Sequence, residues 1–318
     1  MNNRRDFIYY AMMSSIGISA LSMVGCSSQR ILEQTKKNRN GPLISLAQWS
    51  LNRAFFGGSL DPSNFPTIAK RDYDISAVEY VNQFYTKHAL NDSFWINLNR
   101  QATDEGVKSL LIMVDNEGDL GNPNDSERHL VIENHTKWIH AAKLLGCHSI
   151  RVNAFGDGSK EVVREALIDG MGRLSDFAAK EGINVLIENH GLYSSDGKWL
   201  AGIIREADRP NFGTLPDFGN WCLSAKWGST QNNKCEESYD IYQGVKDFLP
   251  FAHGVSAKSY EFNADGNETH IDYYKMMSIV KKFGFTGYIG VEYEGKVLSE
   301  PDGIRATKAL IEKSWKLA

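Results

Sequence analysis

Short β-rich segments alternate with longer helix-prone segments along most of the chain, and this alternation is the strongest constraint on its fold. Parallel neighbouring strands need a long crossover connection, which is usually a helix. The pattern therefore predicts a parallel sheet. We expect eight strands, at Ile44–Gln48, Ala77–Val81, Ser109–Val114, Ser149–Asn153, Asn184–Glu188, Gly213–Pro216, Gly254–Lys258 and Tyr288–Glu292.

Helical patterns occupy the intervals, for example at His129–Leu145, Lys160–Lys180 and Tyr273–Lys282. Gly146 and Gly284 follow two of them closely, as expected of glycines that end helices. No Gly-x-Gly-x-x-Gly motif follows the first strand, which disfavours a dinucleotide-binding sheet. Eight units in a segment close to the ~250 residues typical of such barrels predict a single (β/α)8 TIM barrel over residues 42–318.

The first 26 residues predict export. Arg4 and Arg5 precede an apolar pair, and residues 11–25 carry no charge before Cys26. The arginine pair fits a twin-arginine signal, and Leu21–Cys26 resembles a lipobox. A transmembrane anchor would need ~20 apolar residues, and this segment is shorter. We therefore expect a signal peptide at 1–25, a lipid on Cys26, a flexible tether at 26–41, and a protein anchored on the periplasmic side.

The charge and the cysteine content limit which partners and which disulfide or zinc frameworks can be expected. The net charge is −4, and no Lys/Arg-rich run follows the tether, so a nucleic-acid partner is not expected. Contact with a membrane is expected only through the lipid on Cys26. The other cysteines are Cys147, Cys222 and Cys235, too few and too irregular for a disulfide framework or a zinc ribbon. A Cys222–Cys235 bridge is compatible with an oxidising compartment, but the spacing does not establish it.

Acidic residues recur where the expected strands end. Glu79, Glu188, Asp217 and Glu292 lie at or just after the ends of strands two, five, six and eight. Barrel enzymes build their active sites at this end. Carboxylates that converge there would repel one another unless a cation compensates, and oxygen ligands suit divalent metals. Glu79 alone could equally be a salt-bridged rim residue, whereas the other three share one position in the topology.

Three strings in the sequence resemble a known family. "VLIENHG", "LPDFGNW" and "GYIGVEYEG" resemble, in this order and spacing, the sugar phosphate isomerase/epimerase superfamily, which has a xylose isomerase-like barrel and includes endonuclease IV. In the ketose epimerases of that group, Glu, Asp, His and Glu from strands five to eight hold a metal, and the two glutamates move a proton. The resemblance implies that Glu188, Asp217 and Glu292 are the first, second and fourth ligands.

The third metal ligand departs from the family pattern. Ser256 stands where relatives carry histidine, and Asn220 replaces another histidine found in several of them. His270, in the loop after strand seven, or His190 could complete the ligand set. His253 has the opposite strand phase and is not expected to bind metal. With so few histidines, the three-metal chemistry of endonuclease IV is not expected.

The expected site also contains a lysine and sugar-binding groups. Lys258 shares the phase of Ser256 and could stabilise an enediolate oxygen, donate a proton if its pKa were lowered, or simply pair with Glu292 or Glu294. Aromatic and amide side chains crowd the strand ends, which suits a sugar, although rings also cap barrel cores. We expect substrate contacts from Glu79, Asn153, His190, Asn220 and Trp221. No glycine-rich phosphate loop occurs and arginine is sparse there, so an unphosphorylated sugar is expected.

These observations support a leading function and two competitors. The leading hypothesis is a sugar isomerase or epimerase with one divalent ion (Mn, Co, Zn or Mg), in which Glu188 and Glu292 transfer a proton next to a carbonyl and Lys258 assists. A 3-keto-glycoside lyase would use the same step for β-elimination. A sugar-binding surface lipoprotein without catalytic activity is the competitor from a different class, favoured by the missing histidine and opposed by the paired glutamates.

Overall fold

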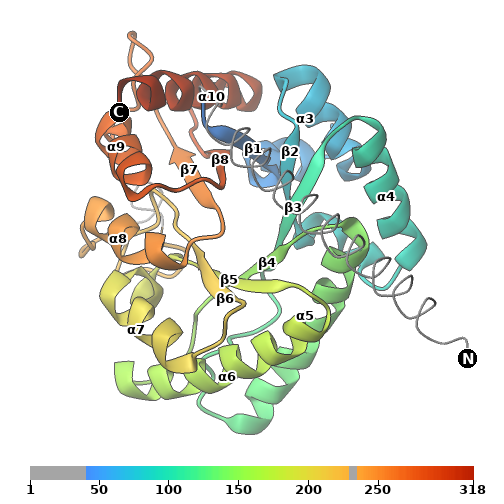
Figure 1. Ribbon diagram of the computed structural model, residues 1–318, viewed down its shortest axis with the longest axis vertical. Coiled ribbons are helices and arrows are strands. Elements are labelled where there is room, and N and C mark those ends of the chain that lie inside the picture. The colour runs from blue at the N-terminus through green and yellow to red at the C-terminus, as the bar shows by residue number, and fades with distance from the viewer. Residues whose placement is uncertain (1–40, 229–234) are drawn as a thin grey trace, which may run out of the picture. The chain divides into compact units, whose positions relative to one another are not determined.

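Eight parallel strands form the centre of the structure, in the order β6-β5-β4-β3-β2-β1-β8-β7 (Figure 1). They are β1 (Leu43–Ala47), β2 (Ala77–Val81), β3 (Lys108–Met113), β4 (Ser149–Val152), β5 (Asn184–Glu188), β6 (Phe212–Leu215), β7 (Val255–Ser259) and β8 (Tyr288–Tyr293). Parallel bridges from Thr214 to Ala252 and from Asp217 to Ser256 join β6 to β7 and close the sheet. The predicted (β/α)8 barrel is confirmed, and every strand end lies within one residue of its expected position.

Helices surround the strands in a ring (Figure 1). They are α2 (Asn52–Phe56), α3 (Phe65–Tyr73), α4 (Asp92–Asp104), α5 (Asp125–Leu145), α6 (Lys160–Lys180), α7 (Gly197–Ala207), α8 (Ile241–Phe248), α9 (Tyr273–Phe283) and α10 (Glu300–Leu317). Helix α5 begins four residues before its predicted start, because the Asn124 side chain accepts a hydrogen bond from the Glu127 amide and caps the helix there. Gly146 and Gly284 end α5 and α9 in the left-handed conformation.

Successive side chains of each strand point alternately outward to the helices and inward to the barrel centre, so the molecule has two separate apolar regions. Outward-facing residues such as Val78, Ile150 and Val185 belong to a large cluster that includes helix residues. The side chains that point into the barrel are less apolar as a group, and a small cluster that includes Ala47 and Leu186 fills part of the interior. Because successive strand residues point to opposite faces, the polar residues of the inward phase meet one another inside the barrel.

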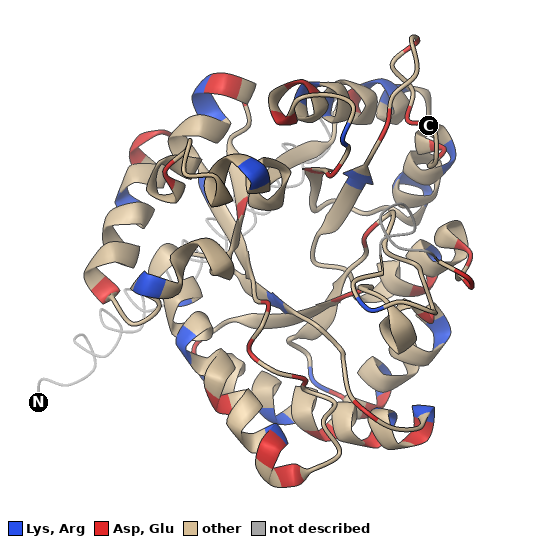
Figure 2. Cartoon of the chain, turned by 180° about the vertical axis from the view of Figure 1, so that it is seen from behind, with Lys and Arg blue, Asp and Glu red and all other residues tan. Residues whose placement is uncertain are grey.

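The structure is a computed structural model that describes residues 41–228 and 235–318. Residues Pro42–Ala318 form one compact unit. The predicted signal peptide and the tether, apart from Gly41, lie outside the described residues. In the part that is described, no helix combines the length and the apolar character needed to cross a membrane. Acidic and basic residues are interspersed along the outer helices (Figure 2).

Candidate active site

Three buried carboxyl groups meet at the carboxyl end of the barrel. Glu188 ends β5, Asp217 follows β6, and Glu292 lies in β8; one carboxylate oxygen from each falls within 4.8 Å of the others. All three side chains are buried. Burial raises the pKa of Asp217 to about 7, with the charge of Glu292 adding to the effect and that of Lys258 opposing it. Burial also raises the pKa of Glu188 well above its usual value, although Arg151 opposes the shift.

Ser256 lies between two of these acids. Its Oγ contacts Asp217 Oδ2 at 2.7 Å and also Glu292 Oε2. A hydroxyl has a single hydrogen to donate, so Ser256 can donate to only one of the two carboxyl groups at a time. The other oxygen of Asp217 accepts the backbone amides of Gly219 and Asn220 at 2.7 and 2.8 Å. The residue that replaces the family histidine therefore connects two acids of the cluster.

Two buried cations contact the cluster. Lys258 Nζ lies 3.6 Å from Asp217 Oδ2, 3.4 Å from Glu292 Oε1 and 3.3 Å from Glu294 Oε1. Burial alone would lower the pKa of Lys258, but the surrounding carboxylates outweigh burial and raise it well above the usual value. Lys258 therefore stays protonated and is too weak an acid to serve well as a proton donor, which leaves charge stabilisation as its role.

Arg151, in β4, is the second cation and was not among the residues expected from the sequence. Its Nη1 donates to Asp115 Oδ1 at 2.6 Å, and its Nε lies 2.8 Å from Glu188 Oε2. The second contact is an ion pair without hydrogen-bond alignment, since neither atom has a hydrogen-bond partner. Burial would raise the pKa of Asp115, but the charge of Arg151 and the hydrogen bonds from Asn153 and Arg151 hold it at about 2. Arg151 therefore connects the acidic cluster to the end of β3.

The cluster fits a divalent metal ion by its donor set and its charge. Glu188, Asp217 and Glu292 offer carboxylate oxygens, which hard divalent cations prefer. Acids outnumber the cations that contact them, and the raised pKa values of Glu188 and Asp217 are the expected result of buried excess negative charge. Glu188 Oε2 is also buried without a hydrogen-bond partner. These three residues would hold the ion.

A cavity of about 560 Å³ opens above this cluster. Among the expected site residues, Glu292, His190 and Asn220 line it. The Asn220 amide donates to Glu188 Oε1 at 3.1 Å, so it connects the cavity wall to the buried acid. Further lining residues are Trp49, Asn52, Arg53, Val81, Gln83, Met113, Asp115, Asn116, Arg151, Trp227, Glu294 and Lys296.

His190 presents a neutral ring to this cavity. Burial and the charge of Arg151 lower the pKa of His190 well below its usual value. The Asn153 amide nitrogen donates to Asp115 at 2.7 Å, so the Asn153 oxygen must accept from His190 Nδ1, also at 2.7 Å. The proton therefore lies on Nδ1, and Nε2 can accept a hydrogen bond from a substrate hydroxyl.

The structure places the remaining expected site residues away from this cavity. Glu79 lies inside the barrel, where Ser45 donates to it at 2.5 Å and burial raises its pKa to about 7. Trp221 is fully buried and packs its ring against Phe248, 5.3 Å between centroids, so it belongs to the core. Asn153 supports His190 from behind and lines a second cavity.

His270 does not join the acids that the structure groups together. It lies in the loop after β7, where its Nε2 is 3.8 Å from Glu261 and its ring packs edge-on to Tyr260. Among the described residues, the grouped acids are Glu188, Asp217 and Glu292 only. The expectation that His270 would complete the ligand set finds no support in this geometry, because the loop directs it toward the surface.

Comparisons with known proteins identify the family. The sequence profile of the xylose isomerase-like TIM barrel family matches residues 69–314. The chain belongs to this family. This finding agrees with the superfamily expected from the three sequence strings. No curated protein matches the chain significantly.

Solved structures of similar fold include other xylose isomerase-like barrels. A 3-keto-D-glucoside 4-epimerase from E. coli is 14% identical, with a TM-score of 0.60 over 80% of this chain and 94% of that one. An L-ribulose 3-epimerase is 11% identical, with a TM-score of 0.64 over 87% and 95%. A D-psicose 3-epimerase from Clostridium cellulolyticum H10 is 12% identical, with a TM-score of 0.60 over 86% and 95%. At these identities the likeness establishes the fold.

Sequence reasoning missed three residues of this xylose isomerase-like site. Arg151 is the one charged residue in the short segment Ser149–Val152. A charged side chain that points into the barrel could have indicated a residue of the site. Asp115 directly follows Val114, the last residue of the expected third strand, and this position after a strand end is the same signal that indicates Asp217. Trp227 lies in the loop after β6, and no sequence pattern indicated that this tryptophan, rather than Trp221, lines the cavity.

Proposed function

We propose that the protein is a metal-dependent sugar isomerase or epimerase that moves a proton on the carbon next to a carbonyl of an unphosphorylated sugar. The observation that carries the proposal is the pair of buried glutamates, Glu188 and Glu292, that converge with Asp217 beside one cavity. Binding alone would not require two buried glutamates that converge on one cavity, whereas proton transfer uses an acid and base pair, and burial raises the pKa of one of them, Glu188. The sugar epimerases of similar fold support the same reaction class.

The protein's side chains would divide the work as follows. Glu292 lines the cavity, and Ser256 and Lys258 fix its two oxygens, so it is placed to exchange a proton with the substrate. Glu188 lies deeper, held by Asn220 and Arg151, and would serve as the partner acid or base. Lys258 would stabilise negative charge that develops on the substrate oxygen. A bound divalent ion would supply Lewis-acid polarisation of the carbonyl.

The charge of the cavity supports a neutral substrate. Contrary to the expectation that arginine is sparse here, Arg53 and Arg151 both line the cavity. Arg53 donates to the Gly295 carbonyl at 2.9 Å, and Arg151 is committed to Asp115 and Glu188. The lining also contains Lys296, and the three acids Asp115, Glu292 and Glu294 balance these three basic residues, so the cavity has no excess positive charge to attract a phosphate. An uncharged sugar, hydrogen-bonded by the neutral His190 ring and the Asn220 amide, fits this lining better.

Deuterium exchange tests the reaction class. The purified protein, loaded with Mn²⁺ or Mg²⁺, is incubated in D₂O with ketohexoses and with 3-keto-glycosides, and the sugars are analysed by NMR. We expect deuterium next to the carbonyl, and its loss in Glu188→Gln and Glu292→Gln. Glu181→Gln is the control, because Glu181 pairs with Lys143 at the surface. Release of the aglycone together with exchange would favour the lyase alternative. Sugar binding without exchange would favour a non-catalytic binding protein and refute the proposal.

We also propose that the protein is exported by the twin-arginine route and anchored by a lipid on Cys26. The arginine pair and the uncharged segment before Cys26 support this proposal. Mass spectrometry of the N-terminus of membrane-extracted protein tests it. We expect an acylated Cys26 as the first residue, and a Cys26→Ala variant that is not lipidated. An unmodified N-terminus that retains residues 1–25 would refute the proposal.

A further inference from the structure

We propose that the active-site cavity continues into a second sugar subsite, so that the substrate is a glycoside whose second unit occupies it. This inference rests on the proposed function for the reacting unit, and it names the substrate class. A second cavity of about 210 Å³ lies next to the main one. Asn116 and Trp227 line both cavities, so the two spaces meet at these side chains.

Both residues at this junction have an uncommon backbone conformation. Asn116 has φ of 63° and Trp227 has φ of 62°. Asparagine adopts this left-handed region fairly often, but a bulky residue such as tryptophan rarely does. Such conformations persist only where the surrounding structure imposes them, and they cluster at ligand sites. The fold therefore holds the Trp227 ring at the junction of the two cavities at a conformational cost.

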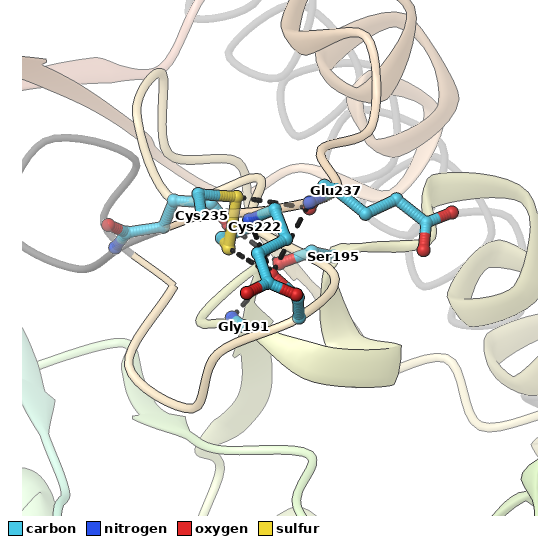
Figure 3. Close-up of a disulfide and its surroundings, with 8 residues drawn as sticks. Gly191, Ser195, Cys222, Cys235 and Glu237 are labelled. Atoms are coloured by element: carbon cyan, nitrogen blue, oxygen red, sulfur yellow. Dashed lines mark hydrogen bonds between the residues drawn. A yellow bond between two sulfur atoms is a disulfide. The ribbon is translucent and has the colours of Figure 1, made fainter.

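Two links hold the loop that carries Trp227, one within the loop and one to the segment that follows β5. A disulfide joins Cys222 to Cys235 close to Gly191 (Figure 3). Gly191 in turn forms an antiparallel bridge with Lys226. The Trp227 ring then packs edge-on against His190, with 5.0 Å between the centroids. His190 belongs to the main cavity, so the loop is positioned relative to the reacting site and not only relative to the surface.

The chemistry of the second cavity suits a sugar ring. Phe155 and Trp227 contribute aromatic surface, with centroids 5.2 Å apart, and Lys226 Nζ lies 4.5 Å from the Phe155 ring centre. Lys226 also pairs with Asp119 at 3.3 Å, which places a cation and a carboxylate beside the rings. Asn116, Glu117, His135 and Asn153 line the same cavity, so the two rings are surrounded by hydrogen-bonding side chains that can orient a ligand. A sugar matches this lining because its C–H faces can pack on the rings and its rim of hydroxyls can hydrogen-bond the polar side chains around them.

Binding of paired sugars tests the subsite without requiring turnover. Isothermal titration calorimetry compares cellobiose, maltose, lactose and trehalose with glucose and galactose, on the purified protein and on Asp119→Asn/Lys226→Met. Both residues line the second cavity only, and their partly exposed ion pair contributes little to stability, so the variant is expected to fold. We expect at least one disaccharide to bind about tenfold tighter than either of its component sugars, and this preference to disappear in the double variant.

Lys143→Met provides the matched control, because Lys143 is a similarly exposed lysine paired with Glu181 and lines neither cavity. It should keep the disaccharide preference. The proposal is overturned if no disaccharide binds tighter than its components, or if the preference survives in the double variant. Deuterium exchange on the same samples separates the two proposals: exchange without a disaccharide preference refutes only the subsite, and a preference without exchange refutes only the catalytic function.

Discussion

Replacing Arg151 with methionine should destabilise the protein strongly and in a pH-dependent manner. The guanidinium is buried and lies 2.6 Å from Asp115 and 2.8 Å from Glu188. Methionine fills much of the same volume but leaves both acids without this cation. Removing one partner of a buried ion pair costs about 3–5 kcal/mol. Without Arg151, Asp115 can stay buried only by taking up a proton. Neutralising an acid of ordinary pKa at pH 7 costs about 4 kcal/mol, which agrees with the cost of breaking the ion pair.

The sign of the pH dependence follows from Asp115. In the parent protein its folded pKa of about 2 lies below the ordinary value, so its pairing stabilises the fold throughout the neutral range and is lost only in strong acid. In the variant, burial without a cation raises the folded pKa above the unfolded one. The folded variant then binds more protons than the unfolded chain, and its stability falls as pH rises. The free energy of unfolding that the variant loses relative to the parent should therefore decrease by about 1.4 kcal/mol for each pH unit below 7.

Urea unfolding followed by tryptophan fluorescence, at pH 7 and pH 5 in the presence of a chelator, measures this deficit. Arg164→Met is the control, because Arg164 pairs with Glu206 at the surface at a similar distance of 2.6 Å. It should change stability little at either pH. A loss below about 1 kcal/mol for Arg151→Met, or an equal loss at both pH values, would contradict the electrostatic explanation.

Three further predictions concern other parts of the fold. Replacing Cys222 and Cys235 with serine should lower the free energy of unfolding by about 3 kcal/mol, because the bridge spans 13 positions of sequence; urea unfolding checks this. Gly303→Ala would place a methyl 2.1 Å from the Tyr293 ring, and calorimetry should show a loss of about 1–3 kcal/mol. Burial lowers the pKa of His148 to about 4, so the free energy of unfolding should rise between pH 4 and 6.5, and His148→Gln should reduce that slope by up to about 1.4 kcal/mol per pH unit.

The fold could be predicted because apolar residues recur at regular intervals in its strands and helices. Each strand is a short apolar or alternating run, and each helix has a recognisable end, so the sequence determines the order of elements and the register of inward residues. The convergence of Glu188, Asp217 and Glu292 follows from the same logic, since the carboxyl ends of all eight strands lie at one end of the barrel.

Loop residues were not predictable in this way. His270 and Trp227 lie in segments without a period, and the direction of their side chains depends on local contacts that the sequence does not reveal. Trp227 is positioned by a disulfide within the loop after β6 and by the bridge between Lys226 and Gly191, which forms only once the barrel brings the β5 and β6 loops together. Trp221 shows the converse, because an aromatic residue close to an acid in sequence can still belong to the core.

The serine between Asp217 and Glu292 has a consequence for the choice of ion. Histidine nitrogen favours zinc, copper and nickel, whereas carboxylate and hydroxyl oxygens favour magnesium, calcium and manganese. Within the described residues, the grouped ligands are carboxylates alone, and Ser256 adds another oxygen beside them. An all-oxygen ligand set would therefore lower the preference for zinc over magnesium and manganese, relative to the same site with a histidine at position 256.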